Sequence, residues 1–558
     1  MKKLTALFLA LLMLFSMTMV YAESSSAPAW EEYDKLIAEI KSTTDFEARK
    51  ALMHKAEDML METGALMPLY YYVDEFMAKP DFKDYYTNLY GMKHFEYATN
   101  GDKNFAKLNL SSEPDKLDPA LNSSVDGGCL AIASFGGLYT HDKEGKLVPN
   151  YSTGYTVSDD GLTYTLTMRE GLKWSDDTPL TAKDFEYSWK RAAATETGAD
   201  YSYMFDIIKG YPDNLAVSAS EDGKTLTMEL SAPCAYMEDL FAFPVYYAVP
   251  QHAVEAAEGY KENPGAWATA PGYPVSGPYK LVEWNHDVNM VYEKNPNYWD
   301  AENVKLEKLE FMLTADTITS YAAYEAGDLD FIESVPTDEL EKAKASGEHY
   351  VVNQLGTYYV VFNVKSPLFA GKTAEQASKM RKALSLLVDR EYIVENIGKM
   401  GQIPANSFIP AKMANGAGGE FKANDDAYTY PVAEETGYYS TKFDESTNIP
   451  AAIELLKEAG FEFGEDNKLS PNTPLSFEYL TNTHTAHEAI AQTIQQDFAA
   501  IGIEMTIKSI DWKVFLNERK QGNYDVARSG WIADFNDPIN MLEMWTTDSG
   551  NNDAQFGR

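Results

Sequence analysis

Hydrophobic and polar positions follow two rhythms along the chain, and each rhythm predicts one type of element. Apolar side chains recur three or four positions apart at Leu36, Ile37 and Ile40, which is typical of one face of a helix. Strict alternation at 162–168 is typical of a strand. Together the rhythms predict helices at 33–41, 45–63, 181–191, 317–326, 374–387, 449–459 and 487–501, and strands at 69–73, 105–110, 162–168, 224–230, 279–284, 290–293, 358–364, 475–480 and 504–510. Helices that alternate with strands predict an α/β fold.

The N-terminus has the three parts of a secretory signal peptide. Lys2 and Lys3 are basic, an apolar run follows, and small residues precede a cleavage site after Ala22. A membrane anchor is the alternative, but the apolar run only just reaches the length of a span, and no basic stop signal follows it. No cysteine lies near the cleavage site, which argues against a lipid anchor. We therefore expect a signal peptide at 1–22, a flexible linker at 23–32 and an exported, soluble protein.

Composition narrows the class of protein. The 558 residues include 47 Lys and Arg against 85 Asp and Glu, a formal net charge of −38, which argues against nucleic acids and anionic membranes as partners. With 45% hydrophobic residues the chain is globular, and its length allows several domains of ~100–200 residues each. Two cysteines, Cys129 and Cys234, exclude a disulfide scaffold. In an oxidising compartment they either pair or remain buried free thiols.

No pattern in the sequence predicts an enzyme. The chain has no G-x-S-x-G nucleophile elbow, and Ser366 replaces the first glycine of a phosphate loop that would end at 371–373. His484 and His487 have a helical spacing, but Ala491 stands where a zinc protease requires its second histidine. Polar residues at the start of a helix are the favoured interpretation. We therefore expect no catalytic residues, no metal and no cofactor.

Four separated blocks of sequence resemble a single family. They are LKWSDDTPLTAKDF at 172–185, SGPY at 276–279 with NPNYW at 295–299, RKALSLLVDR at 381–390, and YDVARSGWIADFNDP at 524–538. In these blocks the chain resembles the periplasmic oligopeptide-binding proteins of ABC importers, which are family 5 extracellular solute-binding proteins. One departure is Asp177, which stands where the family has glycine.

The resemblance implies a fold and a division into domains. The fold is the two-lobed periplasmic-binding-protein fold of α/β class, in which a hinge closes the lobes over a ligand and the first lobe carries an extra small α+β subdomain. Lobe 1 is expected at 69–354, with the subdomain at about 127–242, and lobe 2 at 355–558.

The order of the segments differs from that of the family. Residues 33–68 resemble the family's C-terminal segment, whereas 105–119 resemble its N-terminus. The sequence therefore indicates a circular permutation in which 98–103 joins the old ends; a rearranged or misassembled gene is the alternative. If so, residues 33–68 complete lobe 2, and Arg558 lies within about 20 Å of Trp30–Tyr33, the reach of a six-residue connection.

The resemblance also implies roles for individual residues. Asp534 matches the aspartate that pairs with a peptide ammonium group, and the backbone of Gly530 and Ile532 would bind a peptide added as an extended strand. Arg519, Arg528 and His487 match positions that meet peptide carboxylates, although Gly398 replaces a lysine expected among them. Surface salt bridges are the alternative for these residues. A core position is the alternative for Trp512. The complete set of expected substrate-binding residues is Asp534, Arg528, Arg519, His487, Gly530, Trp531, Ile532, Trp512, Glu113, Pro114 and Asp115.

The function implied is that of a monomeric, extracytoplasmic receptor that captures oligopeptides and delivers them to an ABC transporter permease. A receptor of the same fold for a nickel chelate, haem or an oligosaccharide is one alternative, and a secreted hydrolase is another. A carboxylate together with cations in one cleft favours a zwitterionic peptide over a sugar, which would need an aromatic floor without the charges. The length of the peptide stays open.

Overall fold

The computed structural model describes residues 26–143, 145–234, 236–415 and 419–558, and it confirms the predicted α/β class. The expected signal peptide lies outside the described residues, as does the start of the expected linker. The predicted end of the linker at residue 32 is wrong, because a helix begins at Glu31 and the indole of Trp30 is buried. None of the helices in the described part of the chain is long and apolar enough to span a membrane.

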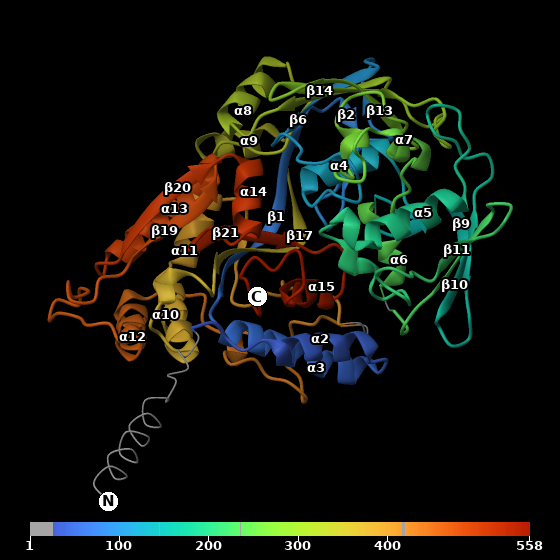
Figure 1. The fold of residues 1–558 in the computed structure, drawn as a ribbon. Helices are drawn as coiled ribbons and strands as arrows, with labels where there is room; N and C mark the ends of the chain where they lie inside the picture. Colours follow the sequence, from blue (N-terminus) through green and yellow to red (C-terminus); the bar gives the residue numbers. More distant parts are fainter. Residues whose placement is uncertain (1–25, 144, 235, 416–418) are drawn as a thin grey trace, which may run out of the picture.

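One mixed sheet connects the two ends of the molecule (Figure 1). It has 11 strands within the described residues, and β18 (Ile403–Pro404) pairs with β1 beside the main path. The order along the path is β13 (Tyr279–Asn285), β14 (Asn289–Lys294), β15 (Lys308–Leu313), β6 (Phe105–Leu110), β16 (Phe331–Ile332), β1 (Leu66–Ala78), β17 (His349–Phe362), β21 (Val526–Ile532), β19 (Ser476–Asn482) and β20 (Glu504–Ile510).

The two central strands are long and pair with each other. β1 has 13 residues and β17 has 14, and they run antiparallel from the pair Leu66–Val361 to the pair Met77–His349. Most side chains of β1 are buried, which explains why its sequence is almost continuously apolar and does not alternate. These two strands are therefore the connection between the two ends of the sheet.

Helices cover both ends of the sheet and form two lobes with it (Figure 1). One lobe contains α4 (Val125–Ser134), α8 (Thr317–Ala326) and α9 (Leu340–Ser346); the other contains α10 (Ala374–Leu386), α12 (Glu445–Glu458), α13 (Thr485–Ala499) and α14 (Trp512–Lys520). A separate sheet of β11 (Val217–Ala219), β12 (Thr225–Glu229), β10 (Thr163–Met168) and β9 (Ser152–Val157) contacts α5 (Ala182–Ala193). Thr181 caps α5 in a capping box with Asp184. The lobe boundaries at 69–354 and 355–558 stay a prediction.

Helices α2 (Glu31–Ser42) and α3 (Phe46–Glu62) pack beneath the C-terminal part of the chain (Figure 1). The ring of Trp30 stacks on Phe556 with the centroids 3.9 Å apart, and its Nε1 donates to the carbonyl of Trp545 at 2.7 Å. Arg49 donates two hydrogen bonds to the carboxylate of Asp537, at 2.7 and 2.8 Å. The N-terminal helices are thus held by aromatic contacts and a bidentate ion pair.

The C-terminal residue lies close to these helices. Arg558 Nε donates to the carbonyl of Thr547 at 3.1 Å, and the backbone N–H of Thr547 donates to Asp34 Oδ1 of α2 at 2.9 Å. In α2 the expected side chains Leu36, Ile37 and Ile40 are buried. In α3 the side chains of Met53, Ala56, Glu57 and Leu60 are buried, whereas Leu52 and Met59 are only partly buried.

Several elements escape the sequence patterns. The hydrophobic patterns do not predict α4, α14, β15 or β21. β17 begins nine residues before the predicted strand, and α12 begins at Glu445, where Asp444 caps it. β21 is buried from Val526 to Ser529, so it shows no alternation.

The two cysteines are not bonded to each other, which leaves the free-thiol alternative. The shorter elements are α6 (Met237–Leu240), α7 (Gln251–Ala256), α11 (Arg390–Tyr392) and α15 (Ile539–Leu542), and the strand pairs are β2 (Phe82–Lys83) with β5 (Thr99–Asn100), β3 (Tyr86–Thr87) with β4 (Lys93–His94) and β7 (Tyr139–His141) with β8 (Leu147–Pro149).

Candidate functional site

A cavity of about 310 Å³ lies between the two lobes, and both lobes line it. β21, α13 and α14 line it from the lobe at the β20 edge, and the N-terminus of α4 and the segment around Tyr201 line it from the other. Eight of the expected residues are brought together here: Asp534, Arg528, Arg519, His487, Gly530, Trp531, Ile532 and Trp512. The site is therefore assembled from segments that are hundreds of residues apart in sequence.

β21 offers free backbone groups to this cavity. The strand pairs with β17 along its whole length, whereas its other edge pairs with β19 only at Val526 and Ala527. Ala533 donates its N–H to the carbonyl of Leu355 at 2.7 Å, and backbone direction alternates along a strand, so the N–H and C=O of Gly530 and Ile532 point away from β17. Both residues line the cavity. An extended ligand can add to this edge as a further strand.

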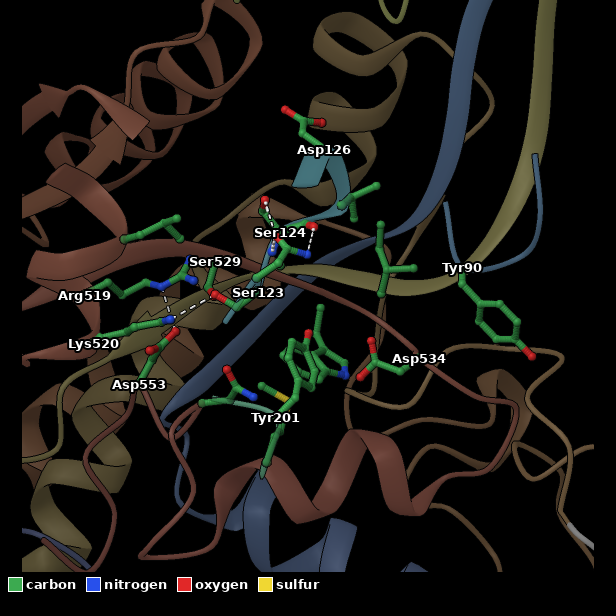
Figure 2. Close-up of a pocket in the computed structure, with 18 of the residues that line it drawn as sticks. Tyr90, Ser123, Ser124, Asp126, Tyr201, Arg519, Lys520, Ser529, Asp534 and Asp553 are labelled. Carbon is green, nitrogen blue, oxygen red and sulfur yellow. Dashed lines mark hydrogen bonds and ion pairs between the residues drawn. The ribbon is translucent and has the colours of Figure 1, made fainter. Parts of the chain in front are cut away.

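Asp534 is a buried carboxyl without a cationic partner. It forms no ion pair with any residue that the structure describes, and Asn540 Nδ2 donates to its Oδ2 at 3.1 Å. Burial is the main cause that raises the pKa of the Asp534 carboxyl well above its usual range. Tyr201, from the opposite lobe, interacts with the Asp534 carboxyl, and Figure 2 shows both side chains in the cavity. A ligand ammonium group would supply the missing positive charge.

Arg528 is a buried guanidinium without an anionic partner. Its side chain forms no ion pair with any described carboxylate, and its Nη2 donates to His487 Nε2 at 2.7 Å. Because arginine stays protonated, His487 accepts as a neutral ring, with its proton on Nδ1 toward the hydroxyl of Tyr358 at 3.3 Å. Burial, followed by the charge of Arg528, lowers the pKa of His487 well below its usual range. This end of the cavity therefore has one unneutralised positive charge.

The other two cations of the cavity already have partners. Arg519 Nε lies 2.7 Å from Asp553 Oδ2, and both side chains are buried. Lys520 pairs with Asp200 of the opposite lobe, and its Nζ also donates to Ser123 Oγ at 3.0 Å. Arg519 is therefore held in a salt bridge, as in the alternative considered for it, although the pair is buried and not on the surface. Figure 2 shows Arg519, Lys520 and Asp553 on the side of the cavity opposite Asp534.

The segment Glu113–Asp115 does not line the cavity, contrary to expectation. Glu113 Oε1 accepts hydrogen bonds from Trp284 Nε1 and His286 Nδ1, at 2.8 and 2.7 Å, so its carboxylate holds the turn between β13 and β14. Pro114 is buried beside it. Asp115 Oδ1 lies 3.8 Å from Lys513 Nζ of α14. The segment therefore contacts the neighbouring strands and the opposite lobe, and not the cavity.

Sequence reasoning missed part of the lining. Lys520 follows Arg519 directly, so a second cation on the same helix was the one available signal. Tyr201, Ser123 and Ser124 had no signal, because their positions depend on how the lobes meet. The two expected pocket tryptophans, Trp531 and Trp512, each contact a polar residue of the site. Trp531 Nε1 donates to Asn540 Oδ1 at 3.0 Å, and the Trp512 ring lies 5.4 Å from the guanidinium of Arg528. Among the described residues no group of three or more His, Cys, Asp or Glu is arranged to hold a metal ion.

Comparison with known proteins agrees with this geometry. The family model of the bacterial extracellular solute-binding proteins, family 5 Middle, matches residues 146–553. The oligopeptide-binding protein OppA of Bacillus subtilis is 32% identical over 468 residues, which are 81% of this chain and 79% of that protein. The dipeptide-binding protein DppE of the same organism is 30% identical and covers 82% of this chain and 80% of its own.

Solved structures give the same result. The crystal structure of Haemophilus influenzae OppA in complex with RPPGFSPFR superposes with a TM-score of 0.70 at 28% identity, over 82% of this chain and 85% of that one. The murein tripeptide-binding protein MppA of Escherichia coli gives a TM-score of 0.71 at 28% identity, over 82% and 84%. The expected two-lobed binding-protein fold is thereby confirmed, and a binding protein is favoured over the hydrolase alternative. The chain belongs to the bacterial extracellular solute-binding proteins of family 5.

Proposed function

We propose that this protein is an extracytoplasmic receptor that binds peptides with free termini and delivers them to an ABC permease. The observation that carries the proposal is the charge pattern of one cavity: Asp534 lacks a cation and Arg528 lacks an anion, within the described residues. Burial keeps the Asp534 carboxyl protonated until a cation binds beside it, and Arg528 is a buried cation without an anion, so each group favours a ligand that supplies the opposite charge. A zwitterionic peptide supplies both, and the edge of β21 binds its main chain without regard to sequence.

Calorimetry with three forms of one peptide tests this proposal. Trialanine should bind more tightly than N-acetyl-trialanine and more tightly than trialanine amide, because each modification removes one terminal charge. Nickel, haem and maltotriose serve as control ligands for the alternative solutes. Equal affinity for all three peptide forms, or binding of a control ligand alone, contradicts the proposal.

We also propose that the order of the elements is circularly permuted relative to the family. About a fifth of this chain and about a fifth of the Bacillus subtilis OppA lie outside their match. Residues 66–78 supply a central strand of the sheet, and Trp30 and Asp34 contact the C-terminal residues, which supports a closed arrangement of the two ends. A variant that starts at residue 104 and places 30–98 after Arg558 should fold and bind trialanine within a few-fold of the parent. An unfolded product contradicts the proposal.

Export and delivery complete the proposed function. The N-terminal pattern at 1–22 favours a cleaved signal peptide, and the periplasmic relatives favour the same compartment. In this proposal the protein is a monomer that docks on permease subunits, and it uses neither a nucleic acid nor a cofactor. Mass spectrometry of the exported protein should find an N-terminus at Glu23; an intact Met1 in that fraction contradicts cleavage.

A further inference from the structure

We propose that Lys520 is a specificity-determining residue that closes the carboxylate end of the cavity and limits the ligand to short peptides, of up to about four residues. This inference rests on the proposed peptide-binding function and names the peptide class that the site accepts. It follows from three features of the described residues: the span between the two unpaired charges, the size of the cavity, and a bridge between the lobes.

The span between the unpaired charges is short. Arg528 and Asp534 are six residues apart on β21 and just beyond it, which is at most about 20 Å at ~3.3 Å per residue. Both residues line the cavity, and an ion pair at each end of the peptide takes about 3 Å of this span. An extended peptide needs the same ~3.3 Å for each of its residues, so about four residues fit between an ammonium group at Asp534 and a carboxylate at Arg528.

The cavity volume agrees with a small ligand. About 310 Å³ is near the lower end of the ~300–1,000 Å³ that is usual for ligand pockets. A ligand whose ammonium group is fixed at Asp534 can become longer only toward the cations at the other end. The guanidinium groups of Arg528 and Arg519 mark that end, since both lie against the ring of Phe515, at 5.6 and 5.1 Å.

Lys520 bridges the two lobes at this end. It lies in the last turn of α14, yet its Nζ pairs with Asp200 and donates to Ser123 Oγ at 3.0 Å, and both partners belong to the opposite lobe. Figure 2 shows Lys520 and Ser123 joined across the cavity beside Arg519 and Asp553. A longer peptide would have to pass between Lys520 and its partners. If the lobes closed over such a peptide, the ion pair between Lys520 and Asp200 would break.

Two variants distinguish a bridge from a direct ligand contact. Lys520→Ala removes the cation, whereas Asp200→Asn removes only its partner on the opposite lobe and leaves the lysine in place. If the bridge limits length, both variants lower the ratio of the hexa-alanine Kd to the trialanine Kd by about tenfold, the effect of one charged interaction. Lys513→Ala is the matched control, because Lys513 lies on the same helix, is half exposed and is 3.8 Å from Asp115.

The experiment is a calorimetric series with di-, tri-, tetra- and hexa-alanine and the nonapeptide RPPGFSPFR, with melting temperatures to confirm that each variant is folded. The parent is expected to prefer tri- or tetra-alanine, to bind the two long peptides at least tenfold more weakly, and to behave like Lys513→Ala. Equal binding of trialanine and RPPGFSPFR by the parent overturns the length limit. An equal loss for all lengths in Lys520→Ala, with no effect of Asp200→Asn, overturns the bridge. Failure of the proposed function looks different, because then the parent binds none of these peptides.

Discussion

Replacing Asp534 with asparagine should weaken peptide binding and, at the same time, stabilise the ligand-free protein. The substitution keeps the size of the side chain, and its amide can still meet Asn540, which hydrogen-bonds to Asp534 Oδ2 at 3.1 Å and to its backbone N–H at 3.0 Å. It removes the charge that would pair with a ligand ammonium group. A charged hydrogen bond contributes about 1.5–3 kcal/mol, so the Kd of trialanine should rise by about 10- to 150-fold.

The stability effect follows from the raised pKa of Asp534. Burial raises this pKa well above its usual range, so the folded protein holds a proton that the unfolded chain has already lost. Stability therefore falls as the pH rises from about 4 through the folded pKa, because the unfolded state binds fewer protons in that window. Asparagine does not titrate, and at neutral pH the ligand-free variant should melt at a higher temperature than the parent.

Calorimetry in two buffers of different ionisation enthalpy measures both effects. When an ammonium group binds Asp534, the carboxyl should release its proton, so the parent should show a buffer-dependent enthalpy that the variant lacks. Asp115→Asn is the matched control, since Asp115 is a partly buried carboxylate that does not line the cavity. The reasoning is refuted if the variant binds trialanine as well as the parent does, or if N-acetylation costs both proteins the same affinity.

Three further predictions concern the rest of the site and the closure of the lobes. Arg528→Gln should weaken trialanine by about tenfold or more but leave trialanine amide almost unchanged, measured by calorimetry; equal losses would place the carboxylate elsewhere. Lys41 pairs with Glu543 and with Asp206 of the other lobe. Lys41→Met should therefore lower the free energy of unfolding, measured with urea, by about 3 kcal/mol, and adding Glu543→Gln should restore part of that loss. Additive losses would contradict this coupling. Small-angle scattering should give a smaller radius of gyration with trialanine than without it, since closure shifts a population of open molecules; an unchanged profile at saturation argues against an open form in solution.

Local patterns were sufficient where an element is amphipathic and has its own start and stop signals. The sequence alone predicted α5 to within two residues of its ends, and the helix α8 and the strands β6 and β20 at their observed ends. The elements α5, α8 and β20 have one buried face and one exposed or partly exposed face, so the order of their apolar residues shows the period of the element. In β6 this alternation holds only for the first four residues. Central strands such as β21 lack this signal because both faces are buried.

The sequence by itself pointed to part of the polar lining of the site, because Asp534 and Arg528 stand in a block that resembles one family, and Arg519 and His487 match further positions of that family. Only the tertiary structure decided which of them are free to bind a ligand. Arg519 is neutralised by Asp553, 34 residues later, and Lys520 by Asp200, 320 residues earlier, whereas Arg528 and Asp534 form no ion pair within the described residues. Pairing between charges depends on distances of a few ångströms across two lobes, and no local pattern encodes such distances.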